Sequence, residues 1–239
     1  ETGFTTEGID LEEAIPRDAE VLVLNTPLNV SGTVFPLEEL ERIRDVAIDY
    51  DLTVISDEVY EGIVYEGSHH SIGSLDGMDE RTITISAFTK SYAMPGWRIG
   101  YLTGPSEFID VVSKIHSNTI STVATSVQKG AISALDGPEE RFDEMRSAFR
   151  ERRDIMVDAF KSAQSDLVEP HGGMYAFVPI GVDDDVQFCE DLIEDEHIVT
   201  VPGSAFGVPG YIRVTFILPP ARLRKGVTQL IDYIQSYPK

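Results

Sequence analysis

The segment Ser86-Ala87-Phe88-Thr89-Lys90, together with Gly96-Trp97-Arg98-Ile99-Gly100 just after it, is the most informative part of this sequence. The β-branched run Thr82-Ile83-Thr84-Ile85 precedes it and predicts a strand that ends just before the lysine. Two cations are unusual at the end of an apolar strand unless a carbonyl or an anionic group meets them there. The segment therefore indicates a ligand site beyond the end of a strand.

Two upstream segments have the same form, with polar residues directly after an apolar run. Asn25-Thr26-Pro27-Leu28-Asn29-Val30-Ser31-Gly32 follows the predicted strand 21–24, and Asp57-Glu58-Val59-Tyr60 follows the predicted strand 52–56. Ligands of open α/β sheets bind beyond the carboxyl ends of the strands. The three segments together predict a shared site for a compact, partly anionic ligand.

The side chains at these strand ends suit one cofactor, a phosphorylated pyridine aldehyde. The amine of Lys90 suits a Schiff base with the aldehyde, and the carboxylate of Asp57 suits a protonated ring nitrogen. Tyr60 and Asn29 suit the phenolic oxygen of the ring. The planar cation of Arg98 suits the phosphate.

These segments resemble the fold-type I pyridoxal-phosphate aminotransferases of class I/II, the aspartate aminotransferase-like group. The matching residues, in chain order, are Asn29 and Gly32, Asp57 and Tyr60, Lys90 to Gly100, Gly172 to Phe177, Val201 to Gly207, and Ile212 to Phe216. The resemblance covers essentially the whole chain. It implies an α/β fold with part of a large, mainly parallel-sheet domain and a smaller C-terminal α/β domain.

The resemblance also implies a function, namely transfer of an amino group from an L-amino acid to a 2-oxo acid with pyridoxal 5′-phosphate on Lys90. It assigns catalysis to Lys90, Tyr60 and Asp57, and the α-carboxylate of the substrate to Arg213 and Asn29. It further implies a homodimer. A cytoplasmic location is expected separately, because the sequence shows no charged-then-apolar leader and no disulfide framework. The cofactor-binding residues expected on this basis are Asn29, Asp57, Tyr60, Ser86, Lys90 and Arg98.

Two residues depart from the family pattern. Val30 stands where the family usually has proline, and Ala87 stands where it prefers glycine or serine. A hydrogen bond to the phosphate is therefore expected from Ser86 or from Thr89 instead.

Three alternatives remain open on the sequence alone. A C–S β-lyase would use the same scaffold, and Arg213 could form an ordinary surface salt bridge on an alternating strand. The third is a catalytically silent fragment, because the resemblance places Glu1 well inside a complete family member. The expected N-terminal third, with its phosphate-binding turn and ring-stacking aromatic residue, has no counterpart here.

Strand and helix signals alternate along the chain, and we expect two domains, 1–138 and 139–239, separated at Asp136-Gly137-Pro138. The first half predicts helices at 36–50, 105–116 and 122–135 and strands at 21–24, 52–56 and 82–86, with the segment 98–103 after the last strand. In the first of these helices Leu37, Leu40, Ile43 and Ala47 recur at helical spacing. The second half predicts a long helix over 139–161, with Phe142, Met145, Phe149, Ile155 and Phe160 facing inward. Strands 174–178, 198–201 and 211–217 and helices 185–195 and 219–236 complete it.

Composition excludes several classes of function. A net charge of −22 argues against a nucleic acid or an anionic membrane as partner, and no apolar run is long enough for a membrane helix. The single Cys189 excludes an internal disulfide and is expected to be a small buried hydrophobe. The pair His69-His70 lacks ligands at metal-binding spacing, so we expect a solvated loop and no metal site.

The acidic charge is spread along the chain rather than gathered in a tail. The sequence has 41 acidic and 19 basic residues, of which six are lysines. A solvated surface would account for this, but scarce lysine with abundant aspartate favours adaptation to high salt.

We therefore predict that the melting temperature is higher in molar KCl than in dilute buffer. The Debye length falls to about 3 Å at 1 M salt, which screens repulsion among the surface carboxylates. Thermal unfolding followed by circular dichroism measures the effect, and equal melting temperatures in the two buffers would contradict the hypothesis.

Overall fold

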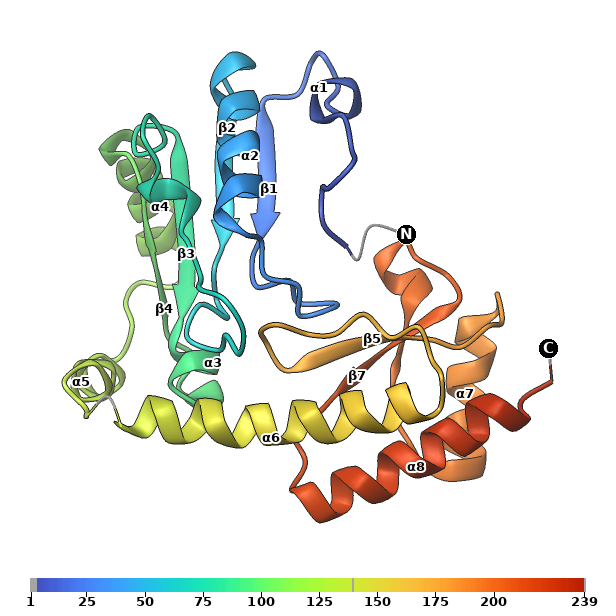
Figure 1. The fold of residues 1–239 in the computed structure, drawn as a ribbon. Helices are drawn as coiled ribbons and strands as arrows, with labels where there is room; N and C mark the ends of the chain where they lie inside the picture. Colours follow the sequence, from blue (N-terminus) through green and yellow to red (C-terminus); the bar gives the residue numbers. More distant parts are fainter. Residues whose placement is uncertain (1–3, 139, 239) are drawn as a thin grey trace. The chain divides into compact units, whose positions relative to one another are not determined.

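The computed structural model describes residues 4–138 and 140–238, which form two compact units (Figure 1). The first unit contains the chain up to Pro27 and Val34–Asp143, and the second contains Leu28–Thr33 and the chain from Glu144 onward. The sequence predicts one boundary after residue 138, and Glu139 itself lies outside the described residues. The division instead falls inside helix α6 (Glu140–Ser162), and a short upstream segment belongs to the second unit.

The first unit is built on a four-stranded sheet in the order β1-β2-β3-β4. Its strands are β1 (Val21–Asn25), β2 (Thr53–Asp57), β3 (Thr82–Ala87) and β4 (Gly100–Thr103). The pairs β1–β2 and β2–β3 are parallel, whereas β4 runs antiparallel to β3. This arrangement confirms the predicted α/β class with a mainly parallel sheet.

Helix α2 (Leu37–Asp49) covers one face of this sheet (Figure 1). Of the residues predicted from helical spacing, Leu40, Ile43 and Ala47 are buried with Leu24 and Val54 of the strands, whereas Leu37 is 39% exposed. Successive residues of a strand point to opposite faces. The register pairs Asp57 with Asn25 and Ile85, so these three lie on the face turned away from the α2 core.

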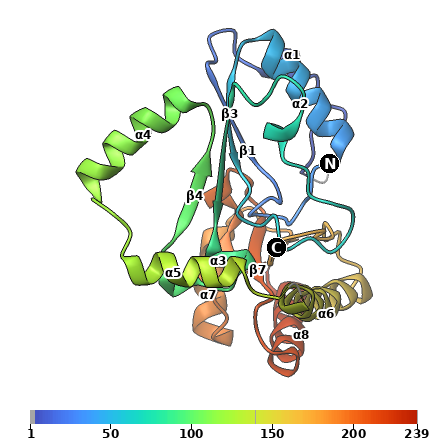
Figure 2. The same ribbon diagram turned by 90° about the vertical axis from the view of Figure 1, so that its left-hand side faces the viewer.

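The remaining elements of the first unit are short or lie at its surface. Helix α4 has no fully buried residue, and Trp97 packs against α5, where a Cβ added to Gly130 would lie 2.3 Å from the indole ring. Figure 2 shows α4 and α5 beside the β4 side of the sheet. These elements are α1 (Leu11–Ala14), η1 (Ile72–Ser74), α3 (Phe88–Ser91), η2 (Pro95–Trp97), α4 (Ser106–Thr119) and α5 (Thr125–Leu135).

The second unit holds a three-stranded antiparallel sheet in the order β5-β7-β6. Its strands are β5 (Tyr175–Pro179), β6 (Val201–Pro202) and β7 (Tyr211–Thr215), and its other elements are α7 (Asp185–Glu196), η3 (Gly203–Phe206) and α8 (Pro220–Ser236). The predicted strand 198–201 is wrong in extent, because only Val201 and Pro202 pair with β7.

The long helix α6 buries one part of its predicted apolar stripe. Ile155 is 5% exposed, and Met156 and Phe160 are each 1% exposed. Phe142, Met145 and Phe149, nearer the N-terminal end of the helix, are only half-buried. The prediction of a continuous inward face therefore holds for the C-terminal half of the helix alone.

Two smaller observations concern burial. Cys189 is 5% exposed as predicted, and this burial raises the pKa of its thiol, which lies 3.1 Å from Thr200 Oγ1. Among the described residues, no helix combines the length and the apolar character that crossing a bilayer would require.

The segment Leu28–Thr33 belongs to the second unit because Gly32 packs tightly there. Its carbonyl oxygen accepts hydrogen bonds from the backbone N–H groups of His171 and Gly172 at 2.9 and 2.8 Å. Its φ is +73°, and an added Cβ would lie 2.5 Å from the carbonyl oxygen of Gly172 and 2.6 Å from Cβ of Pro170. Only glycine fits this position without displacing the neighbouring backbone.

We predict that Gly32→Ala destabilises the second unit more than Gly207→Ala. Both glycines have positive φ, which costs about 1–2 kcal/mol for alanine, but a Cβ on Gly207 meets nothing within 4 Å. The clash at Gly32 adds roughly 1–3 kcal/mol to its loss. Urea denaturation measures both free energies of unfolding, and equal losses would contradict the tight packing at Gly32.

Candidate active site

The turn after β2 holds Asp57 at the carboxyl end of the strand. Its Oδ1 accepts a hydrogen bond from the backbone N–H of Val59 at 3.1 Å. Its carbonyl oxygen accepts from Asn25 Nδ2 at 2.9 Å and from the backbone N–H of Thr26 at 3.2 Å. An aspartate that bonds the backbone two residues on forms a local turn of its own. Asp57 is thus half-buried and fixed in direction where β1 and β2 end.

Tyr60 and Lys90 are neighbours in the first unit. Tyr60 is 1% exposed, and Nζ of Lys90 lies 5.4 Å from the centroid of its ring. The backbone N–H of Gly62 donates to Ser91 Oγ at 3.2 Å, and a Cβ on Gly62 would lie 2.8 Å from the Ser91 side chain. This close contact joins the loop that carries Tyr60 to the helix α3 that carries Lys90. The structure therefore brings together the amine and the phenol expected from the sequence.

Ser86 is placed differently from the expectation. The register pairs it with Tyr101, on the opposite face of the sheet from Asp57. It is 3% exposed, and its hydroxyl donates to Glu61 Oε1 at 2.6 Å. Successive strand residues point to opposite faces. Since Ile85 is paired with Asp57, the next residue, Ser86, points away from the face that carries Asp57. Thr89, the alternative named from the sequence, is half-buried in the first turn of α3.

Arg98 is exposed and follows the η2 turn. Its backbone is left-handed, with φ 51° and ψ 50°, and its Nη1 donates to the carbonyl oxygen of Pro95 at 3.1 Å. A left-handed conformation is uncommon for a residue with a side chain. The turn directs the guanidinium back over its own loop.

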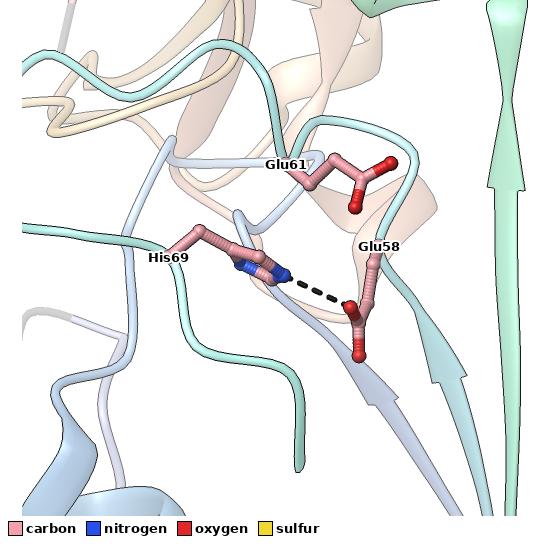
Figure 3. A group of neighbouring side chains, drawn as sticks. All are labelled: Glu58, Glu61 and His69. Atoms are coloured by element: carbon pink, nitrogen blue, oxygen red, sulfur yellow. Dashed lines mark hydrogen bonds and ion pairs between the residues drawn. The ribbon is translucent and has the colours of Figure 1, made fainter. Parts of the chain in front are cut away.

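Glu58 and His69 form a buried pair that the sequence did not predict (Figure 3). Glu58 is 1% exposed, and its Oε2 lies 2.9 Å from Nε2 of His69. Its Oε1 accepts from the hydroxyls of Ser56 at 2.8 Å and Ser71 at 2.7 Å. The expectation of a solvated loop at His69 is therefore wrong, because the loop folds back to satisfy a buried carboxylate.

Glu61 lies close to this pair. Glu58, Glu61 and His69 each offer one atom of a kind that can bind a metal ion, and these three atoms lie within 4.8 Å of one another (Figure 3). Glu61 accepts from Ser86 Oγ and, at 3.3 Å, from the hydroxyl of Tyr101. Each of the three side chains thus takes part in a hydrogen bond within the protein. The hydrogen bonds form two separate sets, one of Glu58 with His69, Ser56 and Ser71 and one of Glu61 with Ser86 and Tyr101, and we call the second set the Glu61 network.

Arg213 and Asn29 meet in the second unit. Nη1 of Arg213, on β7, donates to Asn29 Oδ1 at 3.0 Å. The guanidinium carbon lies 4.3 Å from the ring centroid of Tyr175 and 4.8 Å from that of Phe206. These partners are neutral, and no carboxylate of residues 4–138 or 140–238 forms an ion pair with Arg213 in the structure. The alternative of a surface salt bridge therefore does not describe this arginine.

The side chains form two groups. Asp57, Tyr60 and Lys90 belong to the first unit, and Asn29 and Arg213 belong to the second. The first group provides an amine, a phenol and a carboxylate, which are the functional groups that suit the aldehyde, the ring oxygen and the ring nitrogen of a phosphorylated pyridine aldehyde. The second group provides a half-buried planar cation suited to a carboxylate.

Comparisons with known proteins agree with this chemistry. The family model described as aminotransferase class I and II matches residues 5–230. The probable aspartate/prephenate aminotransferase of Aquifex aeolicus is 36% identical over 241 residues, which is 96% of this chain and 61% of the relative. The aspartate aminotransferase of Thermotoga maritima is 34% identical, with 95% of this chain and 59% of the relative covered.

Solved structures give the same result. The aromatic aminotransferase from Pyrococcus horikoshii OT3 superposes with a TM-score of 0.89 at 33% identity, covering 94% of this chain and 62% of that one. A second Pyrococcus structure, of a protein called A1, has a TM-score of 0.92 at 32% identity. The chain spans about three fifths of the length of these relatives.

We predict that Glu61→Gln lowers the pKa of Tyr101. Burial and the nearby charge of Glu61 raise the pKa of this phenol, because a carboxylate that accepts the phenolic hydrogen disfavours the phenolate. The neutral amide removes the charge. NMR titration of the tyrosine Cζ resonances, assigned with Tyr101→Phe, measures the pKa.

The control is Asp76→Asn, which removes an acidic charge from an exposed turn of the same unit. A Tyr101 pKa that is the same in Glu61→Gln, in the control and in the parent chain would contradict the network described here.

Proposed function

Because the chain belongs to the class I and II aminotransferases, we propose that it transfers an amino group from an L-amino acid to a 2-oxo acid with pyridoxal 5′-phosphate held on Lys90. Its α/β fold is part of the fold-type I architecture that these enzymes share. When bound, this cofactor supplies an electron sink for the electron pair left at the substrate Cα. The residues of the chain have to bind the cofactor, orient the substrate and move the proton.

The observation that carries the proposal is the position of Lys90 beside Tyr60. The amine lies 5.4 Å from the centroid of a phenol ring that is 1% exposed. Tyr60 is in turn three residues after Asp57, which a hydrogen bond to Val59 fixes at the end of β2. An amine, a phenol and a directed carboxylate around one turn are the groups needed by the aldehyde, the ring oxygen and the ring nitrogen of the cofactor.

We assign a separate task to each of these side chains. Lys90 would hold the aldehyde of the cofactor and, once the substrate amine has displaced it, its Nζ would take the proton from the substrate Cα and deliver it to the aldehyde-derived carbon C4′. Asp57 keeps the ring nitrogen protonated, which increases the electron-withdrawing power of the ring. Tyr60 would donate a hydrogen bond to the ring oxygen, and the family resemblance assigns Asn29 to this oxygen as well.

The phosphate is assigned to Arg98 and Thr89. Arg98 is an exposed guanidinium eight residues after Lys90, and its planar fork matches a phosphate. Thr89 replaces Ser86 in this role, because the hydroxyl of Ser86 donates to Glu61 on the opposite face of the sheet.

Arg213 and Asn29 are assigned to the α-carboxylate of the substrate. The guanidinium of Arg213 is half-buried among neutral partners, an amide oxygen and two aromatic rings. A cation in such surroundings is stabilised by an anion that binds in its plane with two parallel hydrogen bonds. Every amino acid and 2-oxo acid carries such a carboxylate.

The substrate class that we propose is an L-amino acid and a 2-oxo acid, with no side chain specified. The relatives are named for aspartate, prephenate and aromatic amino acids, so the carboxylate and the α-amino group are what we carry over to this chain. On the family resemblance we also propose a homodimer that acts in the cytoplasm. Within the described residues, nothing favours a C–S β-lyase or a silent fragment over the transferase.

The test is covalent trapping of the cofactor. We predict that pyridoxal 5′-phosphate, added to the chain in molar KCl and reduced with borohydride, is recovered on the peptide that contains Lys90. The expected mass gain on this peptide is that of one reduced cofactor, because borohydride fixes the bond between Nζ and the aldehyde carbon. Peptide mass spectrometry measures occupancy at each of the six lysines.

Lys90→Ala and Lys114→Ala form the matched pair, since Lys114 is an exposed lysine of α4 in the same unit. The first variant should lose the adduct and the second should keep it. A folded parent chain with no adduct on Lys90, or with label spread equally over its lysines, would contradict the proposal.

A further inference from the structure

Asp185 is a buried acidic residue in the first turn of α7, and the roles assigned above do not involve it. It is 1% exposed, and its Oδ2 accepts hydrogen bonds from the backbone N–H groups of Ser204 at 2.8 Å and Gly210 at 3.2 Å. The adjacent Asp184, in contrast, caps α7 by accepting from the backbone N–H of Gln187 at 3.0 Å. The helix is thus capped by one aspartate, and the other one reaches into a distant loop.

The loop in question, residues 203–210, is tightly closed. The backbone N–H of Val208 donates to the carbonyl oxygen of Gly203 at 3.0 Å. A Cβ on Gly203 would lie 2.3 Å from the carbonyl oxygen of Val208. Asp185 bonds Ser204 near the start of the loop and Gly210 at its end. One carboxylate oxygen therefore links the two ends of the loop, in addition to the backbone hydrogen bond between Val208 and Gly203.

The loop carries Phe206 to the guanidinium of Arg213. The ring centroid lies 4.8 Å from the guanidinium carbon, and the ring also meets Phe177 at 6.1 Å with an interplanar angle of 86°. Phe177 is the neighbour of Arg213 across the β5–β7 pair. The position of Phe206 thus depends on the loop, and the loop depends on Asp185.

We propose that Asp185 is a positioning residue for the carboxylate-binding guanidinium of Arg213, acting through the 203–210 loop and Phe206. The inference rests on the proposed function, in which Arg213 receives a substrate carboxylate. Phe206 restricts the guanidinium to the orientation in which its edge meets the ligand. Less rotational freedom is then lost on binding, so the affinity for the carboxylate is higher.

The charge of Asp185 is essential to this role. Two N–H groups donate to a single oxygen, and hydrogen bonds to an ionised acceptor are about twice as strong as neutral ones. Asparagine has nearly the same shape, but its carbonyl oxygen is a neutral acceptor. Asp185→Asn should therefore loosen the loop while the buried volume stays filled.

The experiment is NMR of the Arg213 side-chain Nε–H group in the full chain, with 2-oxoglutarate as the probe. The resonance, assigned by its loss in Arg213→Lys, is sensitive to the ring current of Phe206 even without ligand. We expect Asp185→Asn and Phe206→Leu to move it in the same direction and to weaken 2-oxoglutarate binding about three- to tenfold. The control is Asp184→Asn, which makes the same change in charge and keeps a good helix-capping residue. It should leave the Arg213 resonance and the affinity for 2-oxoglutarate unchanged.

Ser204→Pro is the second variant. It removes one donor to Asp185 and leaves the carboxylate in place. If Asp185→Asn does not fold, Ser204→Pro has to move the Arg213 resonance for the proposal to stand. An unshifted resonance in a folded Asp185→Asn or Ser204→Pro variant would overturn it.

The two proposals fail in different ways. A parent chain whose Arg213 resonance does not respond to 2-oxoglutarate would contradict the carboxylate role of Arg213 and hence the proposed function. A parent chain that responds, with Asp185→Asn responding equally and with the same unliganded resonance, would contradict only the role of Asp185.

Discussion

The parallel register of β1, β2 and β3 determines the chemistry of the first unit. It pairs Asp57 with Asn25 on one side and with Ile85 on the other. A slip of one residue would exchange the faces of the strand and turn Asp57 toward the α2 core. The same register directs Ser56 to the α2 side, where it bonds the buried Glu58. One strand register thus places Asp57, the carboxylate that we propose for the cofactor, and Ser56, the partner of the buried Glu58, on opposite faces of the sheet.

In the second unit, too, successive strand residues point to opposite faces of the sheet, and this separates a buried residue from the proposed site residue. Ile212, next to Arg213 on β7, is fully buried, whereas Arg213 itself lies on the other face with Tyr175 and Phe177. Contacts between a cation and aromatic rings contribute about 0.5–2 kcal/mol each, and they leave the net charge in place. The surrounding residues therefore hold the guanidinium still without neutralising it. That combination suits a residue whose anionic partner is a ligand.

The sequence alone could predict the parts of the site that lie at strand ends. Asp57, Tyr60 and Lys90 follow apolar runs at short spacing, and parallel strands bring such ends together. Ser86 lies on the face opposite to Asp57 because the β2–β3 register pairs Asp57 with the preceding residue, Ile85, and no local pattern reveals this register. The helical period identified Leu40, Ile43 and Ala47 of α2 but wrongly included Leu37, and it extended the buried stripe of α6 too far.

Contacts between distant segments account for the rest of what was missed. His69 bonds Glu58 across a loop, and Asp185 bonds two backbone groups in a segment beyond its own helix. Gly32 holds Leu28–Thr33, and with it Asn29, in the second unit through His171 and Gly172. None of these pairs has a characteristic spacing in the sequence. Each is selected by the need to satisfy a buried polar group, which only the folded backbone reveals.

Buried and exposed carboxylates have different surroundings in this acidic chain. Among the described residues, Glu39, Glu58 and Asp185 are the acidic side chains less than a tenth exposed. Each accepts at least two hydrogen bonds: Glu39 from Thr6, Glu58 from Ser56, Ser71 and His69, and Asp185 from Ser204 and Gly210. Salt screens exposed charges far more than buried ones. High ionic strength therefore weakens the repulsion among surface carboxylates, while the hydrogen bonds to the buried ones keep their strength. The same functional group opposes folding at the surface and supports it in the interior.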